Sequence, residues 1–232
     1  MTQKKRPTRT EKVENSFVRK PFKEHKGKQT EFKRLLNTYP IVVATGYAGT
    51  GKTYVPCRLA ARELEMAGNT IDKIVLVRPA LSSSKSLGYF KGTKEEKMLE
   101  WIRPMIGAFL EDWPMSYIEY MIKIGKIECV PMETVKGHSM KNAYIIIDEA
   151  EDLNIKEVKS ILSRIGEGSK MALCGDITQT DLKGDVGLSK LIGMLTGPLG
   201  AIVGHINFDS PDDIVRSNAC RVVIEAFEEI GL

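Results

Sequence analysis

The segment that most constrains this chain spans residues 46–53, which read Gly-Tyr-Ala-Gly-Thr-Gly-Lys-Thr and match the pattern GxxxxGK[ST]. A short apolar run, residues 41–44, precedes the match, and a helical pattern over residues 53–66 follows it. Strand, glycine-rich loop and helix in this order are the context in which the pattern binds phosphate groups. The segment therefore predicts an α/β fold that binds a nucleotide.

The chemistry of this loop follows from its residue types. Glycines let the backbone approach phosphate oxygens closely, and backbone N–H groups at a helix N-terminus face the polyanion. Lys52 supplies a positive charge for the β- and γ-phosphates, and Thr53 supplies a hydroxyl for Mg²⁺. We expect the nucleotide to contact Gly46, Tyr47, Ala48, Gly49, Thr50, Gly51, Lys52, Thr53 and Tyr54. The alternative is a glycine-rich turn that happens to precede a helix.

Strand and helix patterns alternate along the rest of the chain. Short apolar runs predict strands at residues 41–44, 74–77, 127–130, 144–147, 171–174 and 201–208. Helical spacing occurs at residues 30–36, 53–66, 94–110, 115–124, 155–165, 188–195 and 211–230. This order predicts a mostly parallel sheet with helices on both faces.

An acidic pair, Asp148 and Glu149, follows the apolar run at residues 144–147. A side chain at the carboxyl edge of a parallel strand faces the crevice where ligands bind. Asp148 is then placed to hold Mg²⁺, and Glu149 to orient and polarise the attacking water. The alternative is an N-cap for the following helix, whose first turn would contain Glu151 and Asp152.

Charge is distributed unevenly over the 232 residues. Residues 1–34 contain 12 Lys and Arg against four Asp and Glu, and the remainder contains 22 against 26. We expect a basic, flexible or partly ordered arm at residues 1–28 and one domain at residues 29–232. The arm could bind nucleic acid through its phosphates, or it could only aid solubility.

Composition excludes several classes of protein. The four cysteines form no CxxC pair, so we expect neither a zinc site nor a disulfide framework. We expect the protein in a reducing compartment, the cytoplasm. Apolar runs are too short to span a bilayer, so we expect no membrane association.

Four segments together resemble the PhoH family of ATPases, which is related to the RecA-like N-terminal motor domain of superfamily 1 helicases. They are TGYAGTGKT at residues 45–53, VLVRPA at 75–80, IIIDEAED at 145–152 and LSRIGEGSKMALCGDITQTDL at 162–182. The compact form is similar to that of phage-encoded members, which would act in the host cytoplasm. The resemblance implies a RecA-like P-loop NTPase fold, with ATP and Mg²⁺ as cofactors.

The resemblance also implies roles for two glutamines. Gln29 would read the adenine base through its amide, unless it is simply a surface residue. Gln179, in the segment GDITQ, would sense the γ-phosphate. The alternative for that segment is a turn stabilised by local hydrogen bonds of Asp and Thr.

Arg78 and the polar loop after it resemble a motif that contacts a nucleic-acid backbone. We expect this contact from Arg78, Ser82, Ser83 and Lys85, with RNA or single-stranded DNA as the partner. The alternative is a flexible surface loop with an arginine in a salt bridge.

Related helicases receive an arginine at the γ-phosphate from a second motor domain, for which this chain is too short. Arg216 is the first candidate for that role and Arg164 the second, supplied in cis or by a neighbouring subunit. A subunit that donates an arginine implies a closed ring, and the resemblance suggests a hexamer. Either arginine could instead be a surface or ion-paired residue.

The sequence favours Mg-dependent hydrolysis of ATP, with a catalytic site formed by Lys52, Glu149, Gln179 and Arg216. We expect this hydrolysis to be coupled to the binding or remodelling of RNA or single-stranded DNA. One alternative is an ATP-dependent oligomeric scaffold with little turnover. Another is a P-loop kinase, which the carboxylate beside Asp148 and the GDITQ segment disfavour.

Overall fold

The computed structural model describes residues 18–21, 27–79, 99, 101–138, 140–180 and 186–230. In this part of the chain six parallel strands form one sheet, in the order β3-β2-β4-β5-β1-β6. Their bounds are Ile41–Gly46 (β1), Lys73–Arg78 (β2), Ile127–Pro131 (β3), Ala143–Ile147 (β4), Lys170–Cys174 (β5) and Val203–Phe208 (β6). The predicted α/β fold with a parallel sheet is confirmed.

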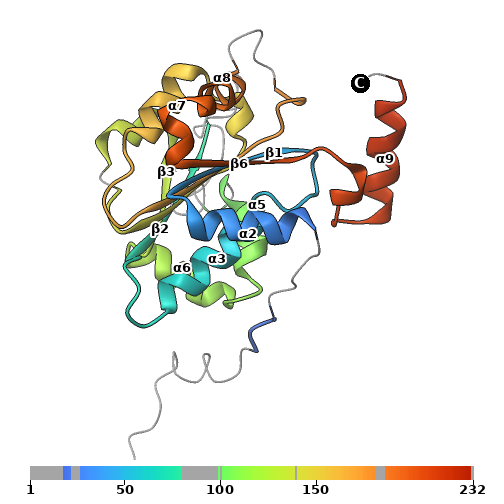
Figure 1. Ribbon diagram of the computed structural model, residues 1–232. Coiled ribbons are helices and arrows are strands. Elements are labelled where there is room, and N and C mark those ends of the chain that lie inside the picture. Colours follow the sequence, from blue (N-terminus) through green and yellow to red (C-terminus); the bar gives the residue numbers. More distant parts are fainter. Residues whose placement is uncertain are drawn as a thin grey trace, which may run out of the picture.

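Helices cover both faces of the sheet (Figure 1). One face carries α2 (Lys28–Thr38), α3 (Tyr54–Glu65), α5 (Arg103–Phe109) and α6 (Met115–Lys123). The other carries α7 (Ile155–Leu162), α8 (Gly187–Gly193) and the 3-10 turn η2 (Met132–Gly137). The described ranges also contain the 3-10 turns η3 (Ala150–Asp152), η4 (Met194–Thr196), η5 (Pro198–Ala201) and η6 (Pro211–Asp213).

The strands are apolar throughout because both faces are covered. Val42 packs into the core on the α3 side, and Val43, one residue on, packs into the core on the α7 side. Ile145 and Ile146 divide in the same way between the two cores. Alternate residues of a strand point to opposite faces, so a strand buried on both sides reads as a continuous apolar run.

The register of the sheet brings the functional segments to one edge. Ala44 of β1 lies beside Cys174 of β5, and Leu173 lies beside Ile147 of β4. The glycine-rich loop after β1 and the acidic pair after β4 therefore leave the sheet at the same level. The backbone N–H of Asp148 also donates to the carbonyl of Val77, 3.0 Å away, which ties this level to β2.

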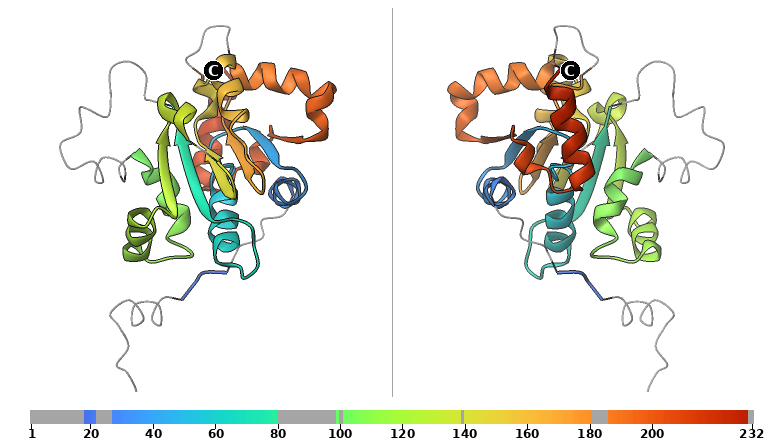
Figure 2. Two further views of the ribbon diagram at one scale, coloured as in Figure 1. Left: turned by 90° about the vertical axis from the view of Figure 1, so that its left-hand side faces the viewer. Right: turned by 90° about the vertical axis from the view of Figure 1, so that its right-hand side faces the viewer.

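The C-terminal helix is shorter than predicted. In place of one helix over residues 211–230, η6 is followed by α9 (Asn218–Glu228). The Ser217 hydroxyl accepts a hydrogen bond from the backbone N–H of Cys220, which caps α9 and places its start. Figures 1 and 2 show α9 standing apart from the layers on the sheet. Within the helix predicted at residues 94–110, residues 103–109 form α5, and residues 94–98 and 100 lie outside the described ranges.

Part of the predicted basic arm lies on the domain. The backbone N–H of Lys20 donates to the carbonyl of Glu111, and Arg58 Nη2 donates to the carbonyl of Lys20, both at 2.9 Å. The four cysteines are free thiols. Among the described residues, no helix combines the length and the apolar character needed to cross a membrane.

Candidate nucleotide-binding site

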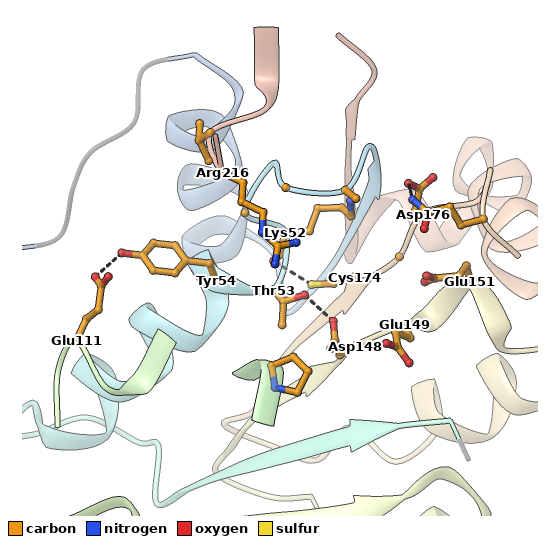
Figure 3. A pocket seen from close by; sticks show the side chains of 17 residues that line it. Lys52, Thr53, Tyr54, Glu111, Asp148, Glu149, Glu151, Cys174, Asp176 and Arg216 are labelled. Carbon is orange, nitrogen blue, oxygen red and sulfur yellow. Dashed lines mark hydrogen bonds between the residues drawn. The ribbon is translucent and has the colours of Figure 1, made fainter. Parts of the chain in front are cut away.

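A cavity of about 630 Å³ opens at the carboxyl edge of the sheet, beside the loop that follows β1 (Figure 3). Its walls come from the loop, from the ends of β4 and β5, from α3 and α5, and from the segment before α9. The lining residues are Ala48, Gly49, Gly51, Lys52, Thr53, Tyr54, Pro104, Glu111, Asp148, Glu149, Glu151, Cys174, Gly175, Asp176, Gln179, Val215 and Arg216. The structure thus brings the phosphate loop and the acidic pair together.

Glycines shape the loop, as predicted from its pattern. Gly46 has a φ of 112°, and a Cβ there would lie 2.1 Å from the carbonyl oxygen of Phe208 on β6. Lys52 Nζ donates to the carbonyl of Tyr47 at 2.6 Å and also to that of Gly46. Burial lowers the pKa of Lys52, whereas the nearby carboxylate of Asp176 acts in the opposite direction. A phosphate chain in the cavity would meet a positive charge that protein carbonyls already hold in place.

The contact that joins the two motifs is a hydrogen bond from Thr53 Oγ1 to Asp148 Oδ1, 2.6 Å long. Thr53 is the residue before α3, but its hydroxyl caps no backbone N–H of that helix, because it points to Asp148 instead. Asp148 is 9% exposed, so its charge is largely removed from solvent.

These two oxygen donors fit a magnesium ion. Mg²⁺ prefers hard oxygen ligands, keeps several waters, and is commonly held by one carboxylate together with substrate phosphates. Among the described residues, no group of three or more His, Cys, Asp and Glu side chains is placed to hold a metal. Thr53 and Asp148 would hold the ion.

Glu149 adopts an unusual backbone conformation, with φ 53° and ψ 41°. Its carboxylate forms an ion pair with Arg78 Nη2, and Arg78 Nε lies 3.5 Å from Asp148 Oδ2. Burial raises the pKa of Glu149, and the charge of Arg78 opposes that effect. The alternative N-cap role of the acidic pair is wrong, because Asn154 forms the capping box that begins α7.

Arg78 lies inside the protein rather than on a surface. It is 7% exposed, and its Nη1 donates to the carbonyl of Trp101 at 2.7 Å. In this conformation its guanidinium is occupied by protein groups and does not face a nucleic acid. Ser82, Ser83 and Lys85, the other residues predicted to contact nucleic acid, lie outside the described residues.

Glu151 also lines the cavity, although its position in the sequence predicted only the first turn of a helix. It lies in η3 rather than in the first turn of α7, and its carboxylate points toward the same space as Asp176 (Figure 3). Burial raises its pKa to about 7, an effect that the backbone N–H groups of Glu151 and Asp176 partly offset. The only hint in the sequence is the acidic character of the segment DEAED.

Gln179 also lines the cavity, in a turn that Asp176 organises. Asp176 Oδ1 accepts from the backbone N–H and the hydroxyl of Thr178, at 3.1 and 2.6 Å. Its Oδ2 accepts from Gln179 Nε2 at 2.6 Å. The segment GDITQ is thus a turn stabilised by local hydrogen bonds, as one interpretation predicted, and its glutamine also lines the cavity. The buried carboxylate of Asp176 holds the amide of Gln179.

Gln29 is not a surface residue. It is 5% exposed, and its Nε2 donates to the carbonyl of Thr50 at 2.6 Å. A Cβ at Gly51 would lie 2.6 Å from this nitrogen, so Gly51 leaves the space that the amide occupies. Gln29 thus supports the phosphate loop from behind and does not line the cavity. Its role in reading adenine stays a prediction.

The two candidate arginines lie at opposite ends of the sheet. Arg216 is exposed at the cavity wall, and the neighbouring backbone N–H of Val215 donates to the carbonyl of Gly49 at 3.0 Å. Arg164 precedes Ile165, which pairs with Met140 at the amino ends of the strands. Of these two arginines, only Arg216 can approach a phosphate in the cavity of its own subunit.

At the other end of the cavity, Tyr54 and Glu111 form a hydrogen-bonded pair. The Tyr54 hydroxyl donates to Glu111 Oε2 at 2.7 Å, and Arg58 Nη1 donates to the Tyr54 oxygen at 2.6 Å. Arg58 is fully buried. This pair connects the cavity wall to the point where Lys20 of the arm is bound. Spacing in the sequence gives no indication of it, because α3 and α5 meet only in the folded chain.

Known proteins of one family match this chain over most of its length. The model of the family described as "PhoH-like protein" matches residues 22–228. The chain is 34% identical over 203 residues to a PhoH-like protein of Bacillus subtilis, covering 87% of this chain and 62% of that protein. For a PhoH-like protein of Synechocystis the identity is 32%, covering 87% and 60%, and for the protein PhoH of Escherichia coli it is 31%, covering 86% and 56%.

A solved structure described as the large terminase from a thermophilic bacteriophage is similar in fold, with a TM-score of 0.53 at 13% identity. The similarity covers 89% of this chain and 50% of that one. The chain spans about 60% of the length of the curated relatives named above. With a RecA-like parallel sheet and a phosphate loop at its carboxyl edge, this chain belongs to the PhoH-like protein family.

Proposed function

We propose that this protein binds Mg·ATP and hydrolyses the bond between the β- and γ-phosphates. The observation that carries the proposal is the 2.6 Å contact between Thr53 Oγ1 and Asp148 Oδ1. It joins the phosphate loop to the acidic strand end at a single point, where one ion can bind both side chains and the phosphates of a nucleotide.

Several residues of the cavity have a task in this reaction. Lys52 and the loop N–H groups bind the phosphates, and Arg216 adds positive charge at the cavity wall. An acidic side chain after β4 orients the attacking water, and Glu149 is the candidate from the sequence. Gln179 lies where a γ-phosphate would alter its hydrogen bond to Asp176. When bound, Mg²⁺ would neutralise charge that develops on the phosphate oxygens.

We extend the proposal to nucleic acid and to assembly. The basic residues of the arm favour binding of a polyanion, and Lys20 is bound to the network that reaches Tyr54. RNA or single-stranded DNA bound by the arm would thereby affect the cavity. A ring of subunits, with a hexamer as the expected form, would allow Arg216 or Arg164 of one subunit to serve a neighbour's nucleotide.

Phosphate release by the purified chain, with Mg·ATP alone and with RNA or single-stranded DNA, tests the proposal. Lys52→Ala should abolish turnover, because the phosphates lose their main counter-charge. Lys170→Ala is the matched control, since Lys170 pairs with Glu63 and does not line the cavity. Turnover that Lys52→Ala leaves unchanged would refute hydrolysis at this site.

One observation favours the alternative of a scaffold with little turnover. The Glu149 carboxylate is bound by Arg78, so it is not free to hold water in this conformation. If ATP changes the mass of the assembly but no phosphate is released with or without nucleic acid, the scaffold is correct and hydrolysis is not.

A further inference from the structure

The cavity beside the phosphate loop has two chemically different sides. Figure 3 shows Tyr54 and Glu111 on one side of Lys52, and the carboxylates of Glu149 and Asp176 on the other. In the proposed reaction the γ-phosphate lies beside Glu149, where the attacking water is oriented. A nucleotide that Lys52 holds by its phosphates then places its ribose on the side of Tyr54 and Glu111.

The Glu111 carboxylate is held in place by two side chains of α3. Its Oε2 accepts a hydrogen bond from the Tyr54 hydroxyl at 2.7 Å and another from Arg58 Nη1. Arg58 Nη1 also donates to the Tyr54 oxygen at 2.6 Å, so the three groups form a closed triangle. Burial and the bond to Glu111 raise the pKa of Tyr54 to about 12, and its hydroxyl therefore stays protonated and remains a donor.

The second oxygen of this carboxylate is left for a ligand. Among the described residues, the hydrogen bonds of the Glu111 carboxylate all end on Oε2. The Glu111 side chain is 27% exposed and lines the cavity, so Oε1 remains as an acceptor for a molecule bound there. The guanidinium of Arg58 balances the charge of Glu111, which lessens the repulsion between this carboxylate and the phosphates of a nucleotide.

We propose that Glu111 is a specificity-determining residue of the nucleotide site, whose Oε1 accepts a hydrogen bond from a ribose hydroxyl. The inference rests on the proposed binding of Mg·ATP. A hydrogen bond to a carboxylate is stronger than one between neutral groups, because the acceptor is charged. Since Tyr54 and Arg58 already fix the carboxylate, little conformational freedom is lost when the hydroxyl binds. A nucleotide that lacks this hydroxyl leaves the acceptor without its donor and is disfavoured.

Calorimetry with ATP, 2′-deoxyATP and 3′-deoxyATP in the presence of Mg²⁺ tests this contact. Wild type should bind at least one of the two analogues about tenfold more weakly than ATP, because that analogue lacks the donor. In Glu111→Gln the amide oxygen should face Tyr54 and Arg58, which are donors, so the NH₂ group takes the place of Oε1. This group cannot accept a hydrogen bond, and the same analogue should then bind within about threefold of ATP.

Glu65→Gln is the matched control. Glu65 ends α3 and contacts the arm through Arg19, much as Arg58 contacts it at Lys20, but Glu65 does not line the cavity. Its carboxylate accepts from Trp113 Nε1 at 2.6 Å. This variant should prefer ATP over the analogue as wild type does. Loss of the preference in Glu65→Gln as well would show that the arm contacts set it, and would overturn the inference.

Inorganic tripolyphosphate with Mg²⁺ separates recognition of the ribose from the shape of the cavity. It can bind to the phosphate loop but carries no sugar, so Glu111→Gln should bind it within about twofold of wild type. Equal weakening of tripolyphosphate and ATP in Glu111→Gln would show that Glu111 only supports the cavity wall, and the proposed contact would be wrong.

The two proposals fail in different ways. If wild type binds no ATP, the nucleotide site itself is refuted. If wild type binds ATP and both analogues equally, or if Glu111→Gln keeps the preference of wild type, the binding of ATP stands and the role of Glu111 is refuted.

Discussion

Arg58 of α3 and Asp112, just after α5, form an ion pair in the interior, with Arg58 Nε 2.5 Å from Asp112 Oδ2 and both side chains fully buried. Arg58 also binds Glu111 and the carbonyl of Lys20. The pair holds α3, which begins at the phosphate loop, against the turn after α5 that contains Glu111 and against the N-terminal arm. It thus links the geometry of the cavity to the stability of the fold.

Breaking this pair should destabilise the protein strongly. Asp112→Asn keeps the shape but leaves the buried guanidinium without its main counter-charge, and we expect a loss of about 3–5 kcal/mol in the free energy of unfolding. Urea denaturation measures it. Glu225→Gln, which removes a partner of the exposed Arg221, should leave the transition unchanged. A loss below about 1 kcal/mol for Asp112→Asn would show that Arg58 finds other partners.

Thr53→Ala and Asp148→Asn should each weaken Mg-dependent binding of ATP. Thr53→Ala removes an oxygen that the ion would contact, and Asp148→Asn removes the negative charge of the other ligand. Each change should cost about 1.5 kcal/mol or more, which is about tenfold in affinity. Calorimetry with and without Mg²⁺ measures the effect. Thr134→Ala is the control, because the Thr134 hydroxyl donates to the carbonyl of Pro131, away from the cavity. Equal affinities with and without Mg²⁺ in wild type would contradict the metal site.

Gly175→Ala should cost about 1–3 kcal/mol of stability, because the added methyl meets both the carboxylate and the backbone of Glu151. Gly107→Ala is the matched control: Gly107 lies within α5, and a Cβ there meets nothing within 4 Å. It should stabilise the protein by about 0.5–1 kcal/mol through helix propensity. Thermal unfolding of the two variants should therefore shift in opposite directions.

Glu151 should make stability depend on pH. Its pKa is raised from 4.5 to about 7, so the folded protein holds this proton more tightly than the unfolded chain does. The resulting stability is present below about pH 4.5 and is lost as the pH rises to about 7. Because Gln carries no charge, Glu151→Gln should be more stable than wild type at pH 8. We expect a difference of about 1–2 kcal/mol in the free energy of unfolding, which is smaller than the full pKa shift implies because solvent partly screens the Glu151 side chain.

Denaturation at pH 5, 6.5 and 8 measures this difference, which should shrink toward pH 5. Equal stability of Glu151→Gln and wild type at pH 8 would show that the carboxylate is solvated rather than buried.

Much of the fold was predictable from local patterns. The apolar run that became β4 reads as a buried strand because both faces of the sheet are covered, and the loop at Lys52 reads as a phosphate loop because its glycines are required by backbone geometry. The one helix predicted over residues 211–230 is instead η6 and α9, because helical spacing in the sequence carries little information about where Ser217 caps the chain. The side-chain partners were less predictable: Arg78 was expected at a nucleic-acid surface and is an interior partner of Glu149.

The amino-acid sequence alone determined the parallel α/β architecture, the phosphate loop and the acidic residue that meets it, because these follow from residue spacing and from the backbone geometry of short segments. Only the tertiary structure decided that Glu149 binds Arg78, that Glu151 faces the cavity, and that Arg58 connects the arm to Tyr54. Those contacts join segments far apart in the chain, and which of several charged side chains meet depends on the packing of α3, α5 and η3 around the sheet.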